Sequence, residues 1–207
     1  RAGVGAVARR SIVIARLEGA PRSVVPARGQ FPDAERIALF TRMAEKVSAT
    51  VVRVADRDAV PAAVADHLRA HNLPAALRTG DDPLLADLPW ATTSIVVTKG
   101  PSDGTDTVGL SHAVGGIAET GTLVLVSGPD NPTTVNFLPE AHVVVIEAKD
   151  IAGDMETVFD AIRSRYGKGQ MPRTVNMVTG PSRSGDIEQT ILLGAHGPRS
   201  LHIVVVG

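Results

Sequence analysis

Runs of consecutive apolar residues constrain the fold of this chain more than any other feature. Residues 123–126, residues 203–206 and most of residues 142–147 are valine, isoleucine or leucine. A strand with one face in water alternates apolar and polar side chains, whereas a strand covered on both faces does not. The runs therefore predict a sheet that lies between two covering layers.

Short apolar runs alternate with helical patterns from residue 50 onward. The predicted strands are residues 50–54, 75–78, 94–98, 122–127, 142–147, 174–179 and 201–206. The predicted helices are residues 58–71, 154–165 and 186–193. Such alternation is typical of the α/β class, so we expect three layers with a mostly parallel sheet and helices on both faces. The last helix and its two flanking strands form a βαβ unit in this prediction.

Two further helices are predicted before the first strand. Residues 6–19 form one, and a second follows Asp33, while the Pro-, Gly- and Arg-rich stretch between them indicates a loop or an extended arm. We expect residues 1–48 to be a helical extension that docks on the α/β domain of residues 49–207, or on a second subunit. The second arrangement would make the protein a homo-oligomer. No linker in the sequence requires an independent domain.

Composition excludes several classes of function. The chain has 207 residues, a formal net charge of −1 and only 3% aromatic residues, which argues against nucleic acid as a partner. No apolar run approaches the roughly 20 residues of a membrane span. The chain has no cysteine, so it cannot hold a cysteine-ligated iron–sulfur cluster or use a thiol nucleophile. The absence of disulfides agrees with a cytoplasmic location.

A polar, glycine-rich loop follows the predicted strand at residues 174–179. Free backbone N–H groups at such a place attract anions, and an arginine can grip a carboxylate or phosphate. The predicted ligand-binding residues of this loop are Gly180, Ser182, Arg183, Asp186 and Glu188. The structural alternatives are that Asp186 caps the predicted helix, that Glu188 is stabilised in its first turn, and that Arg183 is a solvated surface residue.

A second glycine-rich segment contains Glu119 in a tight turn before the strand at residues 122–127. A carboxylate held there can act as a base or nucleophile, or it can accept backbone N–H bonds and hold the turn. Thr120, Gly121 and Thr122 are predicted to bind the ligand beside it. The two glycine-rich segments would lie at opposite edges of a wholly parallel sheet. Only an antiparallel neighbour would bring them together.

His196 is a candidate general base or orienting donor, and its alternative role is to bond the end of its own predicted helix. That helix would be about 12 Å long, which places Asp186 and His196 at opposite ends of the sheet. No metal site is predicted, because His112 and His142 lack partners at ligand spacing. His67 and His71 are expected to be solvated. Neither ordinary nucleotide-binding glycine motif is present.

Three motifs occur in an order and spacing that is similar to a known family. They are residues 118–122 (Ala-Glu-Thr-Gly-Thr), residues 180–188 (Gly-Pro-Ser-Arg, then Asp-Ile-Glu) and residues 194–198 (Gly-Ala-His-Gly-Pro). Together they resemble the lactate-utilisation family that carries the LUD domain, in particular its stand-alone branch. The resemblance implies a fold of the sugar-phosphate isomerase and CoA-transferase-like type. It also implies a part in bacterial oxidation of L-lactate to pyruvate, with iron–sulfur partner proteins.

Three hypotheses for the function follow. In the first, the chain is a cluster-free component of the lactate-oxidising system, its cofactor unknown, that binds a small carboxylate or phosphate through the loop at residues 180–188. In the second, it is a self-sufficient acyl- or phosphoryl-transfer enzyme or isomerase that uses Glu119. Residues 119–121 resemble the Glu-Asn-Gly turn of one class of CoA-transferases, with Thr in place of Asn. In the third, it is a ligand sensor or scaffold.

Overall fold

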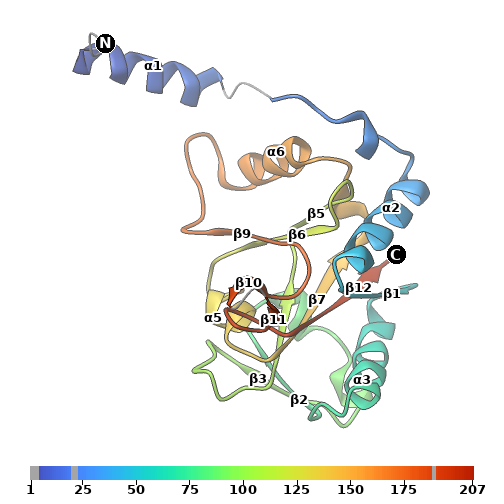
Figure 1. Ribbon diagram of the computed structural model, residues 1–207. Coiled ribbons are helices and arrows are strands. Elements are labelled where there is room, and N and C mark those ends of the chain that lie inside the picture. The colour runs from blue at the N-terminus through green and yellow to red at the C-terminus, as the bar shows by residue number, and fades with distance from the viewer. Residues whose placement is uncertain (1–4, 20–22, 188–189) are drawn as a thin grey trace.

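A six-stranded, wholly parallel sheet forms the centre of the molecule (Figure 1). The computed structural model describes residues 5–19, 23–187 and 190–207, and only the backbone of residues 185–187 and 190–192. The strand order is β1 (Thr50–Val54), β12 (Ser200–Val206), β7 (Ala141–Glu147), β4 (Val108–His112), β2 (Ala76–Thr79) and β3 (Val96–Lys99). Every neighbouring pair in this order is parallel. The predicted α/β class with a parallel sheet is confirmed.

The continuous apolar runs fill two cores at once. Along β7, Val143 and Val145 pack into one core, while Val144 and Ile146 pack into the other. All four side chains are fully buried. Since successive side chains of a strand point to opposite faces, a strand between two cores must be apolar at every position.

Helices cover one face of the sheet, and a helix together with a second sheet covers the other. The first face packs against α3 (Val60–Ala70) and α4 (Pro83–Ala86). The second face packs against α2 (Asp33–Lys46), whose Phe40 and Ala44 are fully buried. The predicted helix after Asp33 is therefore part of the main core.

The second sheet was not predicted. Its order is β8 (Ile151–Ala152), β5 (Gly115–Ile117), β6 (Thr122–Val126) and β9 (Val175–Val178), and β6 runs antiparallel to both β5 and β9. The prediction that the strands at 122–127 and 174–179 belong to the parallel sheet is wrong. The short strand β5 and a tight turn send the chain straight back as a hairpin. Helix α6 (Met155–Tyr166) covers the outer face.

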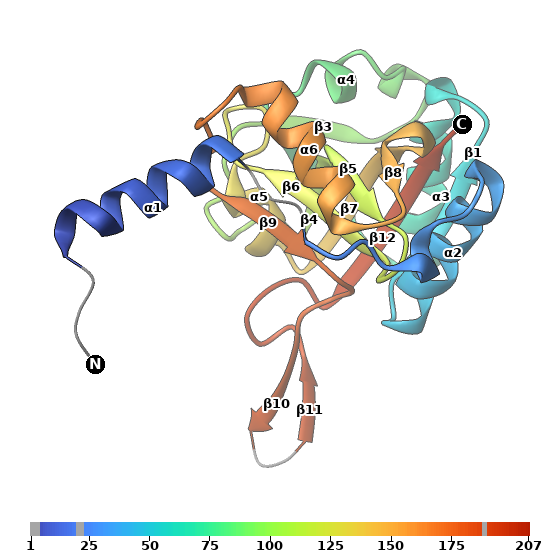
Figure 2. The same cartoon turned by 90° about the horizontal axis from the view of Figure 1, so that it is seen from above.

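The predicted helix at residues 186–193 is wrong, and with it the βαβ unit. Strands β10 (Arg183–Ile187) and β11 (Thr190–Leu193) form an antiparallel hairpin. Figure 2 shows this hairpin extending away from the two sheets. Between the paired residues, positions 185 and 186 lie opposite the single position 191, which makes a bulge. A glycine at position 185 suits a bulge, and a short apolar run such as 190–193 fits a strand as well as a helix.

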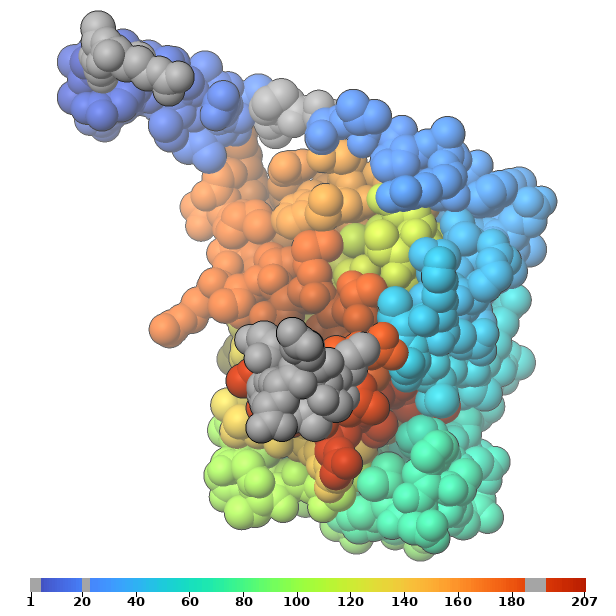
Figure 3. Space-filling model, viewed as in Figure 1, coloured from blue at the N-terminus to red at the C-terminus, as the bar shows by residue number. Residues whose placement is uncertain are grey.

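The N-terminal helix lies at the edge of the molecule (Figure 3). No residue of α1 (Ala6–Gly19) is buried. The remaining short helices are η1 (Ala27–Gly29), η2 (Arg57–Ala59), η3 (Trp90–Thr92), α5 (Thr133–Phe137) and η4 (Ala148–Asp150). Within the described ranges, no helix is long and apolar enough to cross a membrane.

Three histidines form a stack where α3 packs against β12. The rings of His67 and His202 are stacked with their centroids 3.8 Å apart, and the ring of His71 is 4.2 Å from that of His67. His67 is only 8% exposed, so the prediction that it is solvated is wrong. Burial lowers the pKa of His67 to about 4 and that of His202 to about 3. The two stacked rings of His67 and His202 are therefore neutral at pH 7.

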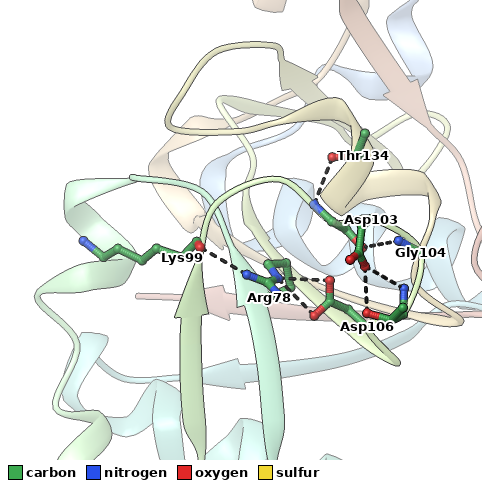
Figure 4. Close-up of polar contacts among 8 residues, drawn as sticks. Arg78, Lys99, Asp103, Gly104, Asp106 and Thr134 are labelled. Atoms are coloured by element: carbon green, nitrogen blue, oxygen red, sulfur yellow. Dashed lines mark hydrogen bonds and ion pairs between the residues drawn. The ribbon is translucent and has the colours of Figure 1, made fainter.

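A polar loop before β4 is held by contacts with β2 and α5 (Figure 4). The Arg78 guanidinium donates to both carboxylate oxygens of Asp106 at 3.0 Å and to the Lys99 carbonyl at 3.1 Å. The Ser102 N–H donates to Thr134 Oγ1 at 3.1 Å. These contacts fix the loop, so its charges serve the fold.

Candidate functional site

Antiparallel pairing of β6 with β9 brings the two glycine-rich segments side by side. Leu123 lies opposite Val178, so the turn before β6 meets the loop after β9. The Oγ1 atoms of Thr122 and Thr179 are 2.7 Å apart. This pairing is the antiparallel neighbour that the sequence-based argument required.

A pocket of about 280 Å³ opens beside this junction, at the amino ends of β7 and β12. We call it the amino-end pocket. Residues 179–183 form one wall and residues 196–198 form another. Asn136, His142 and Leu201 also line it. Of the predicted site residues, Gly180, Ser182, Arg183 and His196 meet here.

Ser182 joins the two walls. Its N–H donates to the Pro198 carbonyl at 2.9 Å, and its carbonyl accepts from the Gly194 N–H at 3.0 Å. Its Oγ accepts from the His196 N–H at 3.3 Å. A hairpin returns the chain to its starting point, whereas a helix would carry it across the sheet. The helix that was expected to separate His196 from Asp186 is therefore absent, and His196 lies beside residues 179–183.

Asp186 does not cap a helix, because its backbone is part of β10. Its side chain is not described, and Glu188 lies outside the described residues. Arg183 is exposed at the rim of the pocket, and its guanidinium donates to Ser48 Oγ. Among the described residues no carboxylate pairs with Arg183. Within that part of the chain, no carboxylate neutralises its charge.

A buried polar cluster lies beneath the pocket. His142 Nε2 is 2.9 Å from Ser111 Oγ, which donates to Asn136 Oδ1 at 2.7 Å. Burial lowers the pKa of His142 to about 3, so the ring is neutral at pH 7. Asn136 Nδ2 is buried and has no hydrogen-bond partner in the part of the chain that the structure describes. An unpaired buried donor costs free energy until an acceptor meets it.

Glu119 is absent from the residues that line the amino-end pocket. Its Oε2 accepts from Arg28 Nε at 2.8 Å, and its side chain is 9% exposed. Its N–H donates to the Gly153 carbonyl at 3.3 Å. Of the two sequence-based alternatives, the observed contacts resemble the structural one, although the carboxylate binds a guanidinium and not a backbone N–H. The pair ties the segment around η1 to the core.

The three residues after Glu119 are occupied by packing. The Oγ1 atoms of Thr120 and Thr122 are 2.7 Å apart, and Thr122 also bonds Thr179. Gly121 has φ +66°, and a Cβ there would lie 2.3 Å from the Ala44 nitrogen. Only a glycine lets this turn approach α2 so closely.

Gly180 makes a similar approach at the same, carboxyl-terminal end of α2. It has φ +75°, and a Cβ there would lie 2.3 Å from the Val47 carbonyl oxygen. Both glycine-rich segments are thus pressed against the same helix. Among the side chains that the structure describes, no group of three or more His, Asp or Glu residues could hold a metal ion.

Comparison with known proteins assigns the family. The LUD domain family model matches residues 37–206, from within α2 to the end of β12. The chain belongs to the LUD domain family. This confirms the resemblance that the three motifs indicate. The matched range includes most of α2, in keeping with the burial of that helix in the core.

Two similar proteins are both named lactate utilization protein C. The one from Geobacillus sp. (strain WCH70) is 37% identical over 100 residues, which are 48% of this chain and 42% of that protein. The one from Bacillus subtilis (strain 168) is 34% identical over 100 residues, with the same shares covered. This chain therefore spans less than half of the length of these relatives.

A solved structure shares the fold. The crystal structure of a DUF162 family protein from Deinococcus radiodurans matches with a TM-score of 0.66 and 21% identity. The match covers 86% of this chain and 100% of that one. At this identity the likeness supports the fold alone.

Proposed function

We propose that this LUD-domain chain takes part in bacterial L-lactate utilisation and binds a small carboxylate or phosphate in its amino-end pocket. The names of its relatives support the process, and the pocket supports the ligand. One observation carries the ligand class: among the described residues, Arg183 has no carboxylate partner and Asn136 Nδ2 has no hydrogen-bond partner. A carboxylate or phosphate offers acceptor oxygens to both.

Within this proposal the chain is a cluster-free component. Oxidation of L-lactate to pyruvate releases two electrons, and a chain without cysteine cannot carry them on a cysteine-ligated cluster. Iron–sulfur partner proteins would receive them. His196, on the wall opposite Arg183, would orient the ligand or exchange a proton with it.

Calorimetry tests the ligand. The purified chain is titrated with L-lactate, pyruvate and inorganic phosphate, and the experiment is repeated with Arg183→Ala. We expect binding of at least one anion, and about tenfold weaker binding in the variant. The matched control is Arg69→Ala, which removes an exposed arginine on α3 that pairs with Asp66. Equal losses in both variants, or no binding by the unaltered chain, would contradict the proposal.

Complementation tests the process. A bacterial strain that lacks this protein is grown on L-lactate as the carbon source, with and without the gene for the full-length protein. We expect growth only with the gene, and slower growth when the gene carries Arg183→Ala. Normal growth of the deletion strain would remove lactate utilisation from the proposal and leave the calorimetric result intact.

The self-sufficient enzyme remains the alternative, with Glu119 as nucleophile or base. It requires Glu119 to release Arg28 and to turn toward a substrate. Incubation with acyl-CoA donors followed by hydroxylamine would trap a Glu119 acyl adduct if one forms. The observed ion pair favours the first proposal, because the carboxylate already has a cationic partner away from the pocket.

A further inference from the structure

A second pocket lies at the opposite end of the parallel sheet. It has a volume of about 220 Å³ and includes Asp82, His112, Asn131 and Arg165 in its walls. We call it the carboxyl-end pocket, because His112 is the last residue of β4 and Asp82 follows shortly after β2. None of its residues belongs to the amino-end pocket.

The topology of the sheet favours a ligand at this place. Strands β2 and β4 are neighbours, with Thr79 opposite Leu110. From β2 the chain continues to β3 on one side, while β4 pairs with β7 on the other side. In open parallel sheets such a switch point leaves a crevice outside the carboxyl ends of the strands, where ligands bind.

The backbone beside the pocket is held by close packing. The Asp81 N–H donates to the Pro129 carbonyl at 2.9 Å, which fixes the turn before α5 over the end of β2. A Cβ at Gly80 would lie 2.2 Å from the Asp130 carbonyl oxygen, so the two segments approach as closely as glycine allows. A preformed wall of this kind reduces the ordering cost of binding.

Asp82 sets the proton arrangement of His112. Asp82 Oδ1 accepts from the Leu84 N–H at 2.8 Å, and its Oδ2 lies 3.1 Å from His112 Nδ1. Burial raises the pKa of Asp82, but the hydrogen bond and charge of His112 and two backbone N–H groups outweigh it, so the net direction is downward. An ionised carboxylate only accepts, so Nδ1 carries a hydrogen that it donates to Asp82, and Nε2 is the ring atom left for a ligand.

Two buried polar atoms of this pocket lack hydrogen-bond partners among the described residues. His112 Nε2 is buried without a hydrogen-bond partner among the described residues. Asn131 is 4% exposed; its Nδ2 donates to the Val126 carbonyl at 3.1 Å, and its Oδ1 is likewise without a partner in the described chain. The bond to Val126 settles which amide atom is the oxygen. Arg165 adds a cation, since its guanidinium is 3.8 Å from Asp130 Oδ2, too far for a hydrogen bond.

We propose that the carboxyl-end pocket binds a small hydroxycarboxylate. Hydroxyl groups of the ligand hydrogen-bond with His112 Nε2 and donate to Asn131 Oδ1, and its carboxylate pairs with Arg165. Because Nε2 is covered, the ligand reaches it only when a side chain of the wall moves. Arg165 is long and half-exposed, so it can move without disturbing the core. Binding and closure of this side chain over the ligand are then one event.

The test is nuclear magnetic resonance of the histidine rings in the whole chain. The His112 signals are assigned with His112→Gln and followed during titration with D-glycerate, L-lactate and propionate. Propionate has the carbon skeleton of lactate without the hydroxyl. We expect saturable shifts of the His112 signals, with affinity in the order glycerate, lactate, propionate, and at least a tenfold range across the three.

Two arginines of α6 give a matched pair of variants. Arg165→Gln removes the cation of the pocket, and we expect about tenfold weaker glycerate binding. Arg163→Gln changes the same helix outside this pocket, and we expect wild-type affinity. If His112→Gln does not fold, calorimetric titration of these two variants with glycerate decides. Equal affinity in both overturns the proposal, and so does a chain that binds none of the three acids.

The same experiment keeps the two sites apart. Arg183→Ala alters only the amino-end pocket, so the His112 shifts should persist in that variant. Their loss in Arg183→Ala, with retention in Arg165→Gln, would assign hydroxycarboxylate binding to the amino-end pocket and overturn this proposal. The proposed function would survive that outcome.

Discussion

The two pockets lie at opposite edges of the same parallel sheet, and they offer different hydrogen-bonding groups. Among the described residues, the amino-end pocket has a donor without a partner, Asn136 Nδ2, and a cation without a carboxylate partner, Arg183. In the same part of the chain, the carboxyl-end pocket has an acceptor without a partner, Asn131 Oδ1, together with His112 Nε2 and the cation of Arg165. A ligand rich in acceptor oxygens suits the first pocket, whereas a ligand with hydroxyl hydrogens suits the second. Under the two proposals, one sheet sorts small anions by their hydroxyl groups.

The largest expected effect is that of acid on the buried rings, one of which lies beneath the amino-end pocket. Burial lowers the pKa of His142 and His202 to about 3 and that of His67 to about 4. Below about pH 6.5 the unfolded chain binds protons at these rings while the folded chain does not. The free energy of unfolding therefore decreases as the pH is lowered. Each ring lowers the free energy of unfolding by about 1.4 kcal/mol per pH unit, and the three together lower it by about 4 kcal/mol per pH unit. The loss ends as the pH approaches the pKa values of the folded chain.

Urea unfolding between about pH 7 and about pH 5 measures this slope. His142→Gln should reduce it by about one third, because one of the three buried rings is gone. An unchanged slope in that variant would show that the ring beneath the amino-end pocket is already charged or hydrated. Water would then reach the side chains beneath that pocket, and the difference in hydrogen-bonding groups between the two pockets would be smaller.

The next effect concerns the glycine that holds the amino-end loop against α2. Gly180→Ala places a Cβ 2.3 Å from the Val47 carbonyl oxygen at φ +75°. We expect a loss of about 2–4 kcal/mol from the backbone conformation and the collision together. Gly169→Ala is the control, because Gly169 has the same φ of +75° with nothing within 4 Å of its added Cβ. It should lose only about 1 kcal/mol, and similar losses in the two variants would show that the loop yields.

A smaller effect is expected on anion affinity, and it should differ between variants of the two pocket arginines. Arg183→Ala should weaken phosphate and pyruvate binding about tenfold and leave glycerate binding unchanged. Arg165→Gln should do the reverse, because each guanidinium contributes a charge-assisted contact in its own pocket. Calorimetry of both variants with all three anions measures this. A variant that weakens every anion equally would indicate one shared site.

The parallel sheet could be predicted from sequence because its signal is local. Strands β7 and β12 lie between two cores, so the absence of polar residues marks them without any knowledge of their neighbours. Strand β4 lacks that mark, since Gly109 and Ser111 interrupt it. A Cβ at Gly109 would lie 2.3 Å from the Val135 carbonyl oxygen, so packing against α5 selects the glycine. That cause is invisible in the sequence.

The hairpin and the pockets depend on contacts between distant residues. The pattern at residues 186–193 fits a capped helix, and only the pairing of β10 with β11 decides against it. Ser111, Asn136 and His142 come from three elements, and no spacing connects them. His112 could have been found by one rule, that polar residues at the carboxyl ends of parallel strands build sites. The rule needed β4 to be recognised as a strand first.

The smallest expected effect is that of the Arg28–Glu119 pair, which lies near the amino-end pocket but outside it. Arg28 is 73% exposed and Glu119 is 9% exposed, so the pair is largely at the surface on one side. Glu119→Gln should cost about 1 kcal/mol or less of stability, and it should leave the binding of phosphate and of glycerate unchanged. Thermal unfolding and the same calorimetric titrations measure both quantities. If Glu119→Gln abolishes phosphate binding while stability is kept, the carboxylate reaches the ligand in solution. The amino-end pocket then extends to the turn before β6 and includes an acceptor, so its contrast with the carboxyl-end pocket is lost.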